Sequence, residues 1–497
     1  MASQTSKPLP YTANPLLLMA NDLMLFLQIT FTWPITAGLP STVIPLWPTR
    51  AGSLDELAPT VPNLWCIFQH VILIVAQIGF IVSLMPLTLV GLPLFYFLYV
   101  VGFVAANKWA SKLINGPRQR GLFQSHPDCV KGKPKHDNEE WVFINGVSVG
   151  KHWLQANLDL IAMTFRRPVV GIHNQTRGII FDVLECIIQR DLGFATMDIR
   201  QSYEALLTIL AKDNIDKVVL ILHSQGGIEG GLVLDWLYDT EDAERLRKLE
   251  IYTFGNAANH WNAPVTASTI PARASQDPTT GSNSINESGA TSQRIVQHIE
   301  HYANEGDYVS KFGVLHFRPD QARTQSLATD GSALPSITSE RADAARLVKN
   351  KAVTYPQPRP PKIKTALARS QTWTTSPQTP IERHDHLKQM QQNNRFFGRL
   401  FKRASSGHLL NQHYLDNMFE MQGVDPRDRS LGEVKDSNEF MDKEVDLGVY
   451  TQWDTVQAVG EERPQGSPTS VRNGTVRTQI KDLSRLWAYR NGGSPRD

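Results

Sequence analysis

The chain has 497 residues, which is enough for one large catalytic domain with additional segments. Its 50 Lys and Arg and 48 Asp and Glu leave a formal net charge of +2, and neither a basic face nor a nucleic-acid-binding module stands out, which argues against a nucleic-acid partner. The three cysteines are too few and too widely spaced for a disulfide framework or a CxxC metal site, and this favours a reducing compartment: Cys66, Cys129 and Cys186.

Residues 64–106 contain no Asp, Glu, Lys or Arg. This run would extend roughly 65 Å as a straight helix, whereas one crossing of a bilayer core takes about 20 residues. A break near 84–86, at Pro86, divides it into arms 64–83 and 87–106 of similar length. We therefore predict an N-terminal membrane-associated region over residues 1–107. Its apolar helical hairpin, 64–106, either spans the bilayer twice or dips in and returns; the alternative is a buried helix of a soluble domain.

Residues 23–47 also lack charge, but their prolines make them a poorer span, and we expect them in the membrane interface with Phe26, Phe31, Trp33 and Trp47 at headgroup depth. Seven Lys and Arg lie within residues 108–135, directly after the hairpin. The positive-inside rule therefore places the following domain in the cytosol, with a luminal position as the alternative. The endoplasmic reticulum or a lipid droplet is the expected membrane.

A polar connector at 108–140 is followed by apolar runs that alternate with segments of helical spacing. Strands are expected at 141–147, 167–172, 217–222, 250–254, 294–302 and 394–401, and helices at 152–165, 178–191, 199–212, from the turn after 222 to Tyr238, and at 409–421. This alternation predicts an α/β fold, with a mostly parallel sheet covered by helices on both faces. The core should occupy residues 141–318 and 392–422.

Two segments interrupt or follow that core with polar composition. Residues 265–292 and 319–391 are rich in Ser, Thr and Pro or Gly, and we predict disordered insertions. Residues 423–497 form a polar C-terminal tail. Within it, Ile480, Leu483 and Leu486 have helical spacing, which predicts a short helix at 479–489 that docks on the domain.

The segment Leu222-His-Ser-Gln-Gly-Gly joins the most apolar strand to a helix, the setting of a nucleophile elbow. A sharp turn lifts the hydroxyl of Ser224 clear of the sheet, and the glycines let the backbone pass close to its neighbours. The helix N-terminus adds a positive partial charge beneath a developing oxyanion. Leu222 stands where the G-x-S-x-G pattern has glycine, so its side chain must find room elsewhere.

A serine nucleophile needs a base, and the base needs an orienting carboxylate. Asp307 follows the strand at 294–302 and is our candidate acid, with Glu305 as the alternative. His408 lies between the expected last strand and a helix, where a loop can place an imidazole over the serine, and His413 is the alternative base. His223 adjoins the serine, but its side chain should point away from Oγ, and we expect it either to pack in the core or to support the site residues from behind.

An oxyanion hole needs two backbone N–H groups. One is expected from Gln225, directly after the nucleophile. The other is expected from Gly146 or Val147, in the turn after the strand at 141–147.

These motifs together resemble the lipase-like serine hydrolases of the α/β-hydrolase superfamily, and most closely the fungal members with an N-terminal membrane segment. The resemblance is strongest over residues 141–260. It implies hydrolysis of a carboxylic ester of a lipid or other apolar acyl substrate through an acyl-enzyme, with no cofactor and no metal. An acyltransferase or thioesterase using the same triad is one alternative. A non-catalytic membrane scaffold with this fold is the other. The sequence does not define an oligomeric state.

Overall fold

The computed structural model describes residues 14–47, 50–90, 92–116, 122–267, 292–318, 396–425, 428–445, 455–456 and 478–495. The expected insertions at 265–292 and 319–391 lie almost entirely outside these residues. At the first of them, β6 (Val265–Ala267) and β7 (Ser292–Arg294) form a small antiparallel pair.

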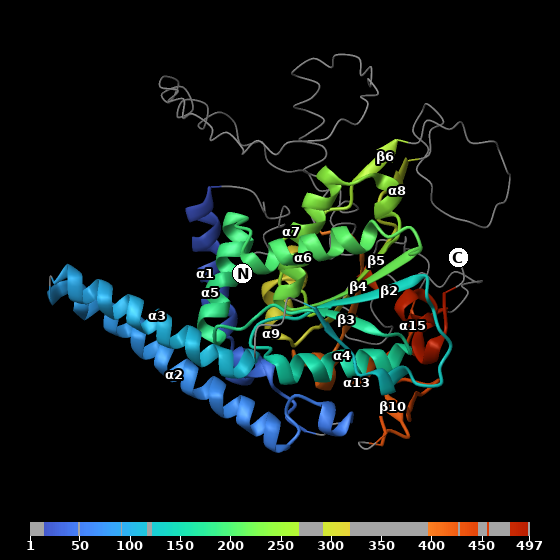
Figure 1. The fold of residues 1–497 in the computed structure, drawn as a ribbon, viewed down its shortest axis with the longest axis horizontal. Helices are drawn as coiled ribbons and strands as arrows, with labels where there is room; N and C mark the ends of the chain where they lie inside the picture. The colour runs from blue at the N-terminus through green and yellow to red at the C-terminus, as the bar shows by residue number, and fades with distance from the viewer. Residues whose placement is uncertain are drawn as a thin grey trace, which may run out of the picture. The chain divides into compact units, whose positions relative to one another are not determined.

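Within the described residues, one sheet of eight strands organises the fold (Figure 1). Only β1 runs antiparallel to its neighbour, and the other pairings are parallel. The α/β class and the mostly parallel sheet expected from the sequence are therefore confirmed. In spatial order the strands are β1 (Leu122–Gln124), β3 (Val169–Ile172), β2 (Glu139–Ile144), β4 (Lys217–His223), β5 (Leu249–Phe254), β8 (His298–Asn304), β9 (Arg399–Arg403) and β13 (Thr455–Val456).

Alternate residues of the central strands enter two separate hydrophobic clusters, one on each face of the sheet. Val219 and Ile221 of β4 pack in the cluster that contains α4 (Lys151–Phe165). Val218, Leu220 and Leu222 pack in the other, with α6 (Met197–Leu210) and α7 (Gln225–Thr240). Because β4 is covered on both faces, it reads as a continuous apolar run.

Two segments of the core differ from the sequence-based expectation. The polar connector at 108–140 contains β1, whose antiparallel pairing with β3 extends the sheet. The single helix expected at 409–421 is wrong: a π-helix, Leu410–Leu415, is followed by the short turn Asp416–Met418. The wider π-helical turn fits a segment whose residues are nearly all buried and bonded to other parts of the chain.

The C-terminal segment is part of the core and not only a polar tail. Phe440, Met441, Ile480 and Trp487 are buried in the cluster on the α4 face. The one expected helix at 479–489 is two short helices, α14 (Ile480–Leu483) and α15 (Arg485–Ala488). The new helix α15 begins at Ser484, whose hydroxyl accepts a hydrogen bond from the backbone N–H of Trp487.

Buried carboxylates fix this C-terminal segment to the sheet. Arg485 and the hydroxyl of Tyr489 donate to Glu250 at 2.8 Å each. Burial opposes ionisation of Glu250, but Arg485 and Lys217 hold its pKa below the usual value. A carboxylate that would be costly alone is therefore compensated by its partners.

The apolar hairpin is present, but its break is not where we predicted it. Helix α2 runs from Val61 to Val90 through Pro86, and α3 spans Pro93–Asn115. Pro86 lies inside α2, where it removes one backbone hydrogen bond but does not end the helix. Pro93 instead sets the start of α3, because a residue before proline avoids the helical region, and Leu92 has φ −105° and ψ 83°. Both helices are long and apolar enough to cross a membrane.

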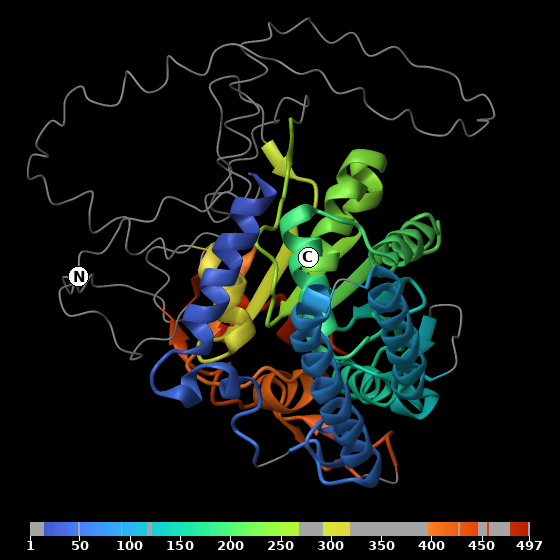
Figure 2. The same cartoon turned by 90° about the vertical axis from the view of Figure 1, so that its left-hand side faces the viewer.

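Helix α1 (Pro15–Thr30) is anchored to the domain by a buried ion pair. Arg190 of α5 (Ile179–Leu192) donates to the Asp22 carboxylate at 2.7 and 2.5 Å, and both side chains are nearly inaccessible. The same guanidinium donates to the carbonyl oxygens of Ala257 and Phe312. Helices α1 and α2 both pack on α5 (Figure 2).

Asp191 supplies a pH test of this anchor. Burial, and then the charge of Asp22, raise the pKa of Asp191 to about 7. The unfolded chain releases this proton near pH 3.9, so the stability from the protonated group is full below about pH 4 and is lost as pH rises to about 7. The free energy of unfolding of Asp191→Asn, relative to that of the parent, should therefore rise as the pH is raised from about 4 to about 7. Above about pH 7 this difference should stay constant. Denaturant titrations at each pH measure it.

The matched control is Asp239→Asn, which makes the same substitution at an exposed position. A gain for Asp191→Asn that is equal at every pH would contradict the account.

Candidate active site

Ser224 occupies a strained turn between β4 and α7. Its φ of 59° and ψ of −120° lie in a region that residues with a side chain rarely adopt. The conformation is held on both sides: the Ser224 N–H donates to the Phe254 carbonyl at 3.0 Å, and its own carbonyl accepts from Gly227 at 2.9 Å and Ala257 at 3.2 Å. This is the backbone geometry that a nucleophile elbow requires.

Two glycines allow the neighbouring backbone to approach this turn. A Cβ added to Gly146 would lie 2.4 Å from Cβ and 2.9 Å from Oγ of Ser224. Both distances are too short for a side chain at position 146 to fit. A Cβ on Gly226 would lie 2.5 Å from the carbonyl oxygen of Ile144. The end of β2 and the start of α7 are therefore packed directly against the serine.

Leu222 finds its room against α7. A Cβ on Gly230 would lie 2.4 Å from Cδ1 of Leu222, so the missing side chain on the helix makes space for the large side chain on the strand. Leu222 is fully buried there. The departure from the glycine of G-x-S-x-G is thus compensated two turns along the following helix.

Asp307 and His408 meet in a direct hydrogen bond, although 101 residues separate them. His408 Nδ1 donates to Asp307 Oδ2 at 2.9 Å, and the same oxygen accepts from the hydroxyls of Tyr414 at 2.6 Å and Ser310 at 2.8 Å. Asp307 caps the N-terminus of α9 (Tyr308–Phe312) through its other oxygen, which accepts from Val309 N. Burial opposes its ionisation, but His408 and the two hydroxyls hold the Asp307 pKa below the usual value.

This bond leaves the other ring nitrogen of His408 available as an acceptor. Nδ1 keeps the proton of its hydrogen bond to Asp307, so Nε2 has the lone pair. His408 Nε2 is buried and has no hydrogen-bond partner in the part of the chain that the structure describes. A buried polar atom without a partner costs free energy and is expected where substrate or catalysis will use it.

The imidazole of His408 lies beside residues that flank Ser224. Its ring stacks on that of His223, with centroids 4.7 Å apart. A Cβ on Gly255, which follows Phe254, would lie 2.8 Å from His408 Nδ1 and 3.0 Å from Asp307 Oδ2. Since Phe254 accepts the Ser224 N–H, the acid, the imidazole and the serine are brought to one end of the neighbouring strands β4, β5 and β8.

The two other histidines near Ser224, His413 and His223, have structural partners. His413 Nδ1 accepts from the N–H of Leu409 at 3.0 Å, and Nε2 donates to the Pro45 carbonyl at 2.8 Å, which occupies both nitrogens. Burial lowers the pKa of His413 to about 4 and that of His223 to about 3, so both are neutral at pH 7. His223 Nε2 donates to the His408 carbonyl at 2.7 Å and so holds the loop. This arrangement favours His408 as the base.

Glu305, the alternative acid, is placed differently from Asp307. It is partly exposed, and its carboxylate pairs with Lys402 at 3.4 Å. The structure thus brings Asp307, and not Glu305, to His408.

A buried amide network fixes the expected oxyanion groups. Gln225 is the first residue of α7, where the backbone N–H groups have no partner within the helix. Its side-chain oxygen accepts from Asn174 at 2.7 Å, and Asn174 N donates to the side chain of Asn145 at 3.0 Å. The turn with Gly146 and Val147 is therefore tied to Gln225 through two asparagines.

The N-terminal segment, residues 41–56, also supports the loop that carries His408. Sequence reasoning missed this support. The N–H groups of Gly407 and His408 donate to the carbonyl oxygens of Ser41 at 3.0 Å and Thr42 at 2.8 Å. Glu56 accepts from the backbone of Asn411 at 3.0 Å and of Gln412 at 3.1 Å. Contacts between backbone groups so far apart in the chain leave no local sequence pattern.

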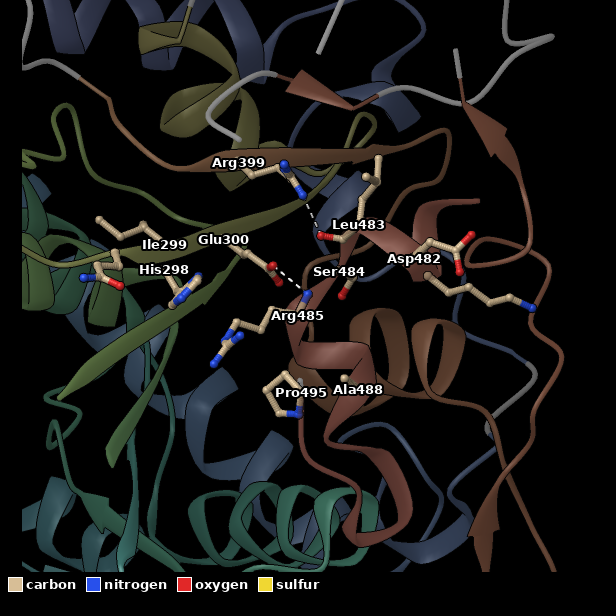
Figure 3. Close-up of a pocket in the computed structure, with 12 residues that line it drawn as sticks. His298, Ile299, Glu300, Arg399, Asp482, Leu483, Ser484, Arg485, Ala488 and Pro495 are labelled. Carbon is tan, nitrogen blue, oxygen red and sulfur yellow. Dashed lines mark hydrogen bonds between the residues drawn. The ribbon is translucent and has the colours of Figure 1, made fainter. Parts of the chain in front are cut away.

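A cavity of about 320 Å³ lies at the other end of the sheet. It is lined by the first residues of β8 and β9 and by the C-terminal segment. Figure 3 shows two hydrogen bonds in its wall: the Arg485 backbone N–H donates to the Glu300 carboxylate, and the Arg399 side chain donates to the Leu483 carbonyl. Asp307 follows the opposite end of β8, so this cavity is separate from the candidate triad. Among the described residues, no group of three or more His, Cys, Asp or Glu is arranged to hold a metal.

The contact between Leu222 and Gly230 gives a double-mutant prediction. Gly230→Ala should destabilise the protein by roughly 1–3 kcal/mol, because the new methyl group overpacks against Leu222. Leu222→Ala should also destabilise, by roughly 2–5 kcal/mol, because it leaves a void. In the double variant the added methyl fills part of that void, so the loss in free energy of unfolding should be smaller than the sum of the two single losses by about 1 kcal/mol or more. Strictly additive losses would contradict the contact.

Comparisons with known proteins give no family for this chain. No protein-family model matches it, and no curated protein sequence matches it. The assignment of chemistry therefore depends on the arrangement of Ser224, His408 and Asp307.

Proposed function

We propose that this chain is a membrane-attached serine hydrolase of the α/β-hydrolase type that cleaves a carboxylic ester of a lipid or other apolar acyl substrate. The observation that carries the proposal is the His408–Asp307 hydrogen bond, with a buried and unpartnered His408 Nε2 near the strained turn at Ser224. In such a site the strained turn presents the Ser224 hydroxyl, and the free lone pair of His408 Nε2 is where its proton would go.

In the acylation step, His408 Nε2 takes the hydroxyl proton of Ser224 while Oγ attacks the ester carbonyl carbon. The electron pair of the C=O bond moves to oxygen, and the oxyanion accepts hydrogen bonds from the N–H of Gln225 and of Gly146 or Val147. As the intermediate collapses, the alcohol leaves with the proton from Nε2. The acyl group stays on Ser224.

Deacylation repeats these movements with water. His408 takes a proton from water as its oxygen attacks the acyl carbon, and it returns that proton to Ser224 Oγ when the acid is released. Asp307 remains ionised throughout and stabilises the imidazolium, which its lowered pKa favours. The triad needs no metal or cofactor for these steps.

The apolar substrate class rests on the membrane-associated helices. A domain attached to a bilayer or lipid droplet meets substrates dissolved there. We place the catalytic domain on the cytosolic side from the basic residues at the end of α3 and directly after it. Transfer of the acyl group to an alcohol, or cleavage of a thioester, would use the same triad. A non-catalytic scaffold is the remaining alternative.

Ester hydrolysis by purified full-length protein in detergent micelles tests the proposal. Ser224→Ala and His408→Ala should each lower kcat at least about 10³-fold, and Asp307→Asn about 10⁴-fold, because the imidazole loses its orientation. The matched control is Ser202→Ala, which removes another buried serine hydroxyl, on α6, and should leave kcat unchanged.

Full activity in Ser224→Ala would refute the proposed nucleophile. Release of acyl products mainly to an added alcohol, with loss in Ser224→Ala, would identify a transferase. A folded parent protein with no activity on esters, thioesters or added alcohols would favour the scaffold.

A further inference from the structure

We propose that the α2–α3 hairpin enters a single leaflet with its tip, residues 81–106, and returns without crossing the bilayer. This inference extends the proposed membrane attachment and is independent of the hydrolase chemistry. It depends on which parts of the two helices are already occupied by the catalytic domain.

The first part of α2 is docked on the domain. Its buried positions recur three and four residues apart, which marks one continuous face of a helix: Asn63, Cys66, His70, Leu73, Gln77 and Phe80. Three of them are polar and have partners in the domain. Asn63 accepts from the indole of Trp153 at 3.0 Å, His70 stacks on the same ring, and Gln77 donates to the Arg177 carbonyl at 2.6 Å.

The last part of α3 is docked in the same way. Asn107 donates to the Arg177 carbonyl at 2.8 Å, and Asn115 donates to the Thr176 carbonyl at 2.8 Å. Gln77 also donates to Asn107 at 2.8 Å, so the two helices and the 176–177 loop share one polar junction. This junction marks the base of the hairpin, because lipid offers no partner for these amide groups.

Beyond this junction most of the tip is free to enter lipid, and only near the base does the Phe103 ring contact Phe181 of α5. Its α2 arm, residues 81–90, is about 15 Å long, and its α3 arm, residues 93–106, is about 21 Å long. The hydrocarbon core of a bilayer is about 30 Å thick. Neither arm reaches across it, although each complete helix has enough apolar residues to do so.

The side chains along the hairpin fit entry at a slant. At the tip, Met85 and Leu89 are 75% and 81% exposed. At the base of α3, Trp109 is exposed between the exposed Lys108 and Lys112, the residue types that settle at headgroup depth. The outward face of α2 stays apolar beside this base. We therefore place the hairpin at a tilt to the membrane normal, with α2 rather than α3 facing the lipid. This tilt reduces the depth that the tip reaches in the bilayer.

Cysteine mapping on full-length protein in sealed vesicles tests this placement. Met85→Cys places a thiol on the tip, and Lys112→Cys places one at the base as the matched control. Both side chains are exposed, so neither change disturbs the packing. The unaltered protein gives the background from the native cysteines, of which Cys66 and Cys129 are buried. A membrane-impermeant maleimide is added outside the vesicles or enclosed inside them. Labelling after denaturing detergent has dissolved the membrane then shows that each thiol is intact.

We expect the Met85→Cys thiol to be protected from this reagent on both sides. Its adduct with a membrane-permeant fluorescent maleimide should be quenched by lipids that carry a spin label on the acyl chain. Lys112→Cys should react from one side only. Reaction of Met85→Cys from the side opposite to Lys112→Cys would show a crossing, and reaction from the same side would show a tip outside the lipid. Either result overturns the proposal. Because the readout is thiol reactivity, it stands whether or not Ser224 proves catalytic.

Discussion

The left-handed backbone of Ser224 is the constraint on which the rest of the site depends. A side chain at φ 59° is stable only where its surroundings fix it, and here the ends of β2, β5 and α7 do so through hydrogen bonds and close backbone contacts. Those contacts require glycine at 146 and 226. The parallel sheet then sets the distances, because the loops after β4, β5 and β8 leave from one edge and carry Ser224, Gly255 and Asp307.

The N-terminal region has a second role besides contact with lipid. Carbonyl oxygens of residues 41 and 42 hold the backbone at His408, and Glu56 holds the π-helical segment behind it. The ion pair between Asp22 and Arg190 anchors α1, which leads into that segment. The chain before the hairpin is therefore a structural part of the candidate site, and it leads directly into the membrane-associated helices.

The sequence predicts the parallel sheet because buried strands such as β4 are short, apolar and followed by helical spacing. Ser224, Asp307 and His408 could be proposed from the sequence for a similar reason: each follows a strand, in the chain order that the α/β-hydrolase resemblance implies. The position of the hairpin break was missed, since Pro86 and Pro93 look alike in sequence and differ only in their place relative to the helix ends. Gly230 was missed because its contact with Leu222 joins two elements whose alignment the sequence does not specify. The π-helix at 410–415 follows from tertiary contacts that involve residues 45–56.

The central claim is that Ser224 is a nucleophile activated by His408. Reaction with a fluorophosphonate, followed by peptide mass mapping, tests it directly because the phosphonyl group remains on the oxygen that attacked. The account predicts one adduct, on the peptide that contains Ser224, and a much slower reaction in His408→Ala than in His413→Ala. An adduct on another residue, or an equal labelling rate without the His408 imidazole, would contradict it.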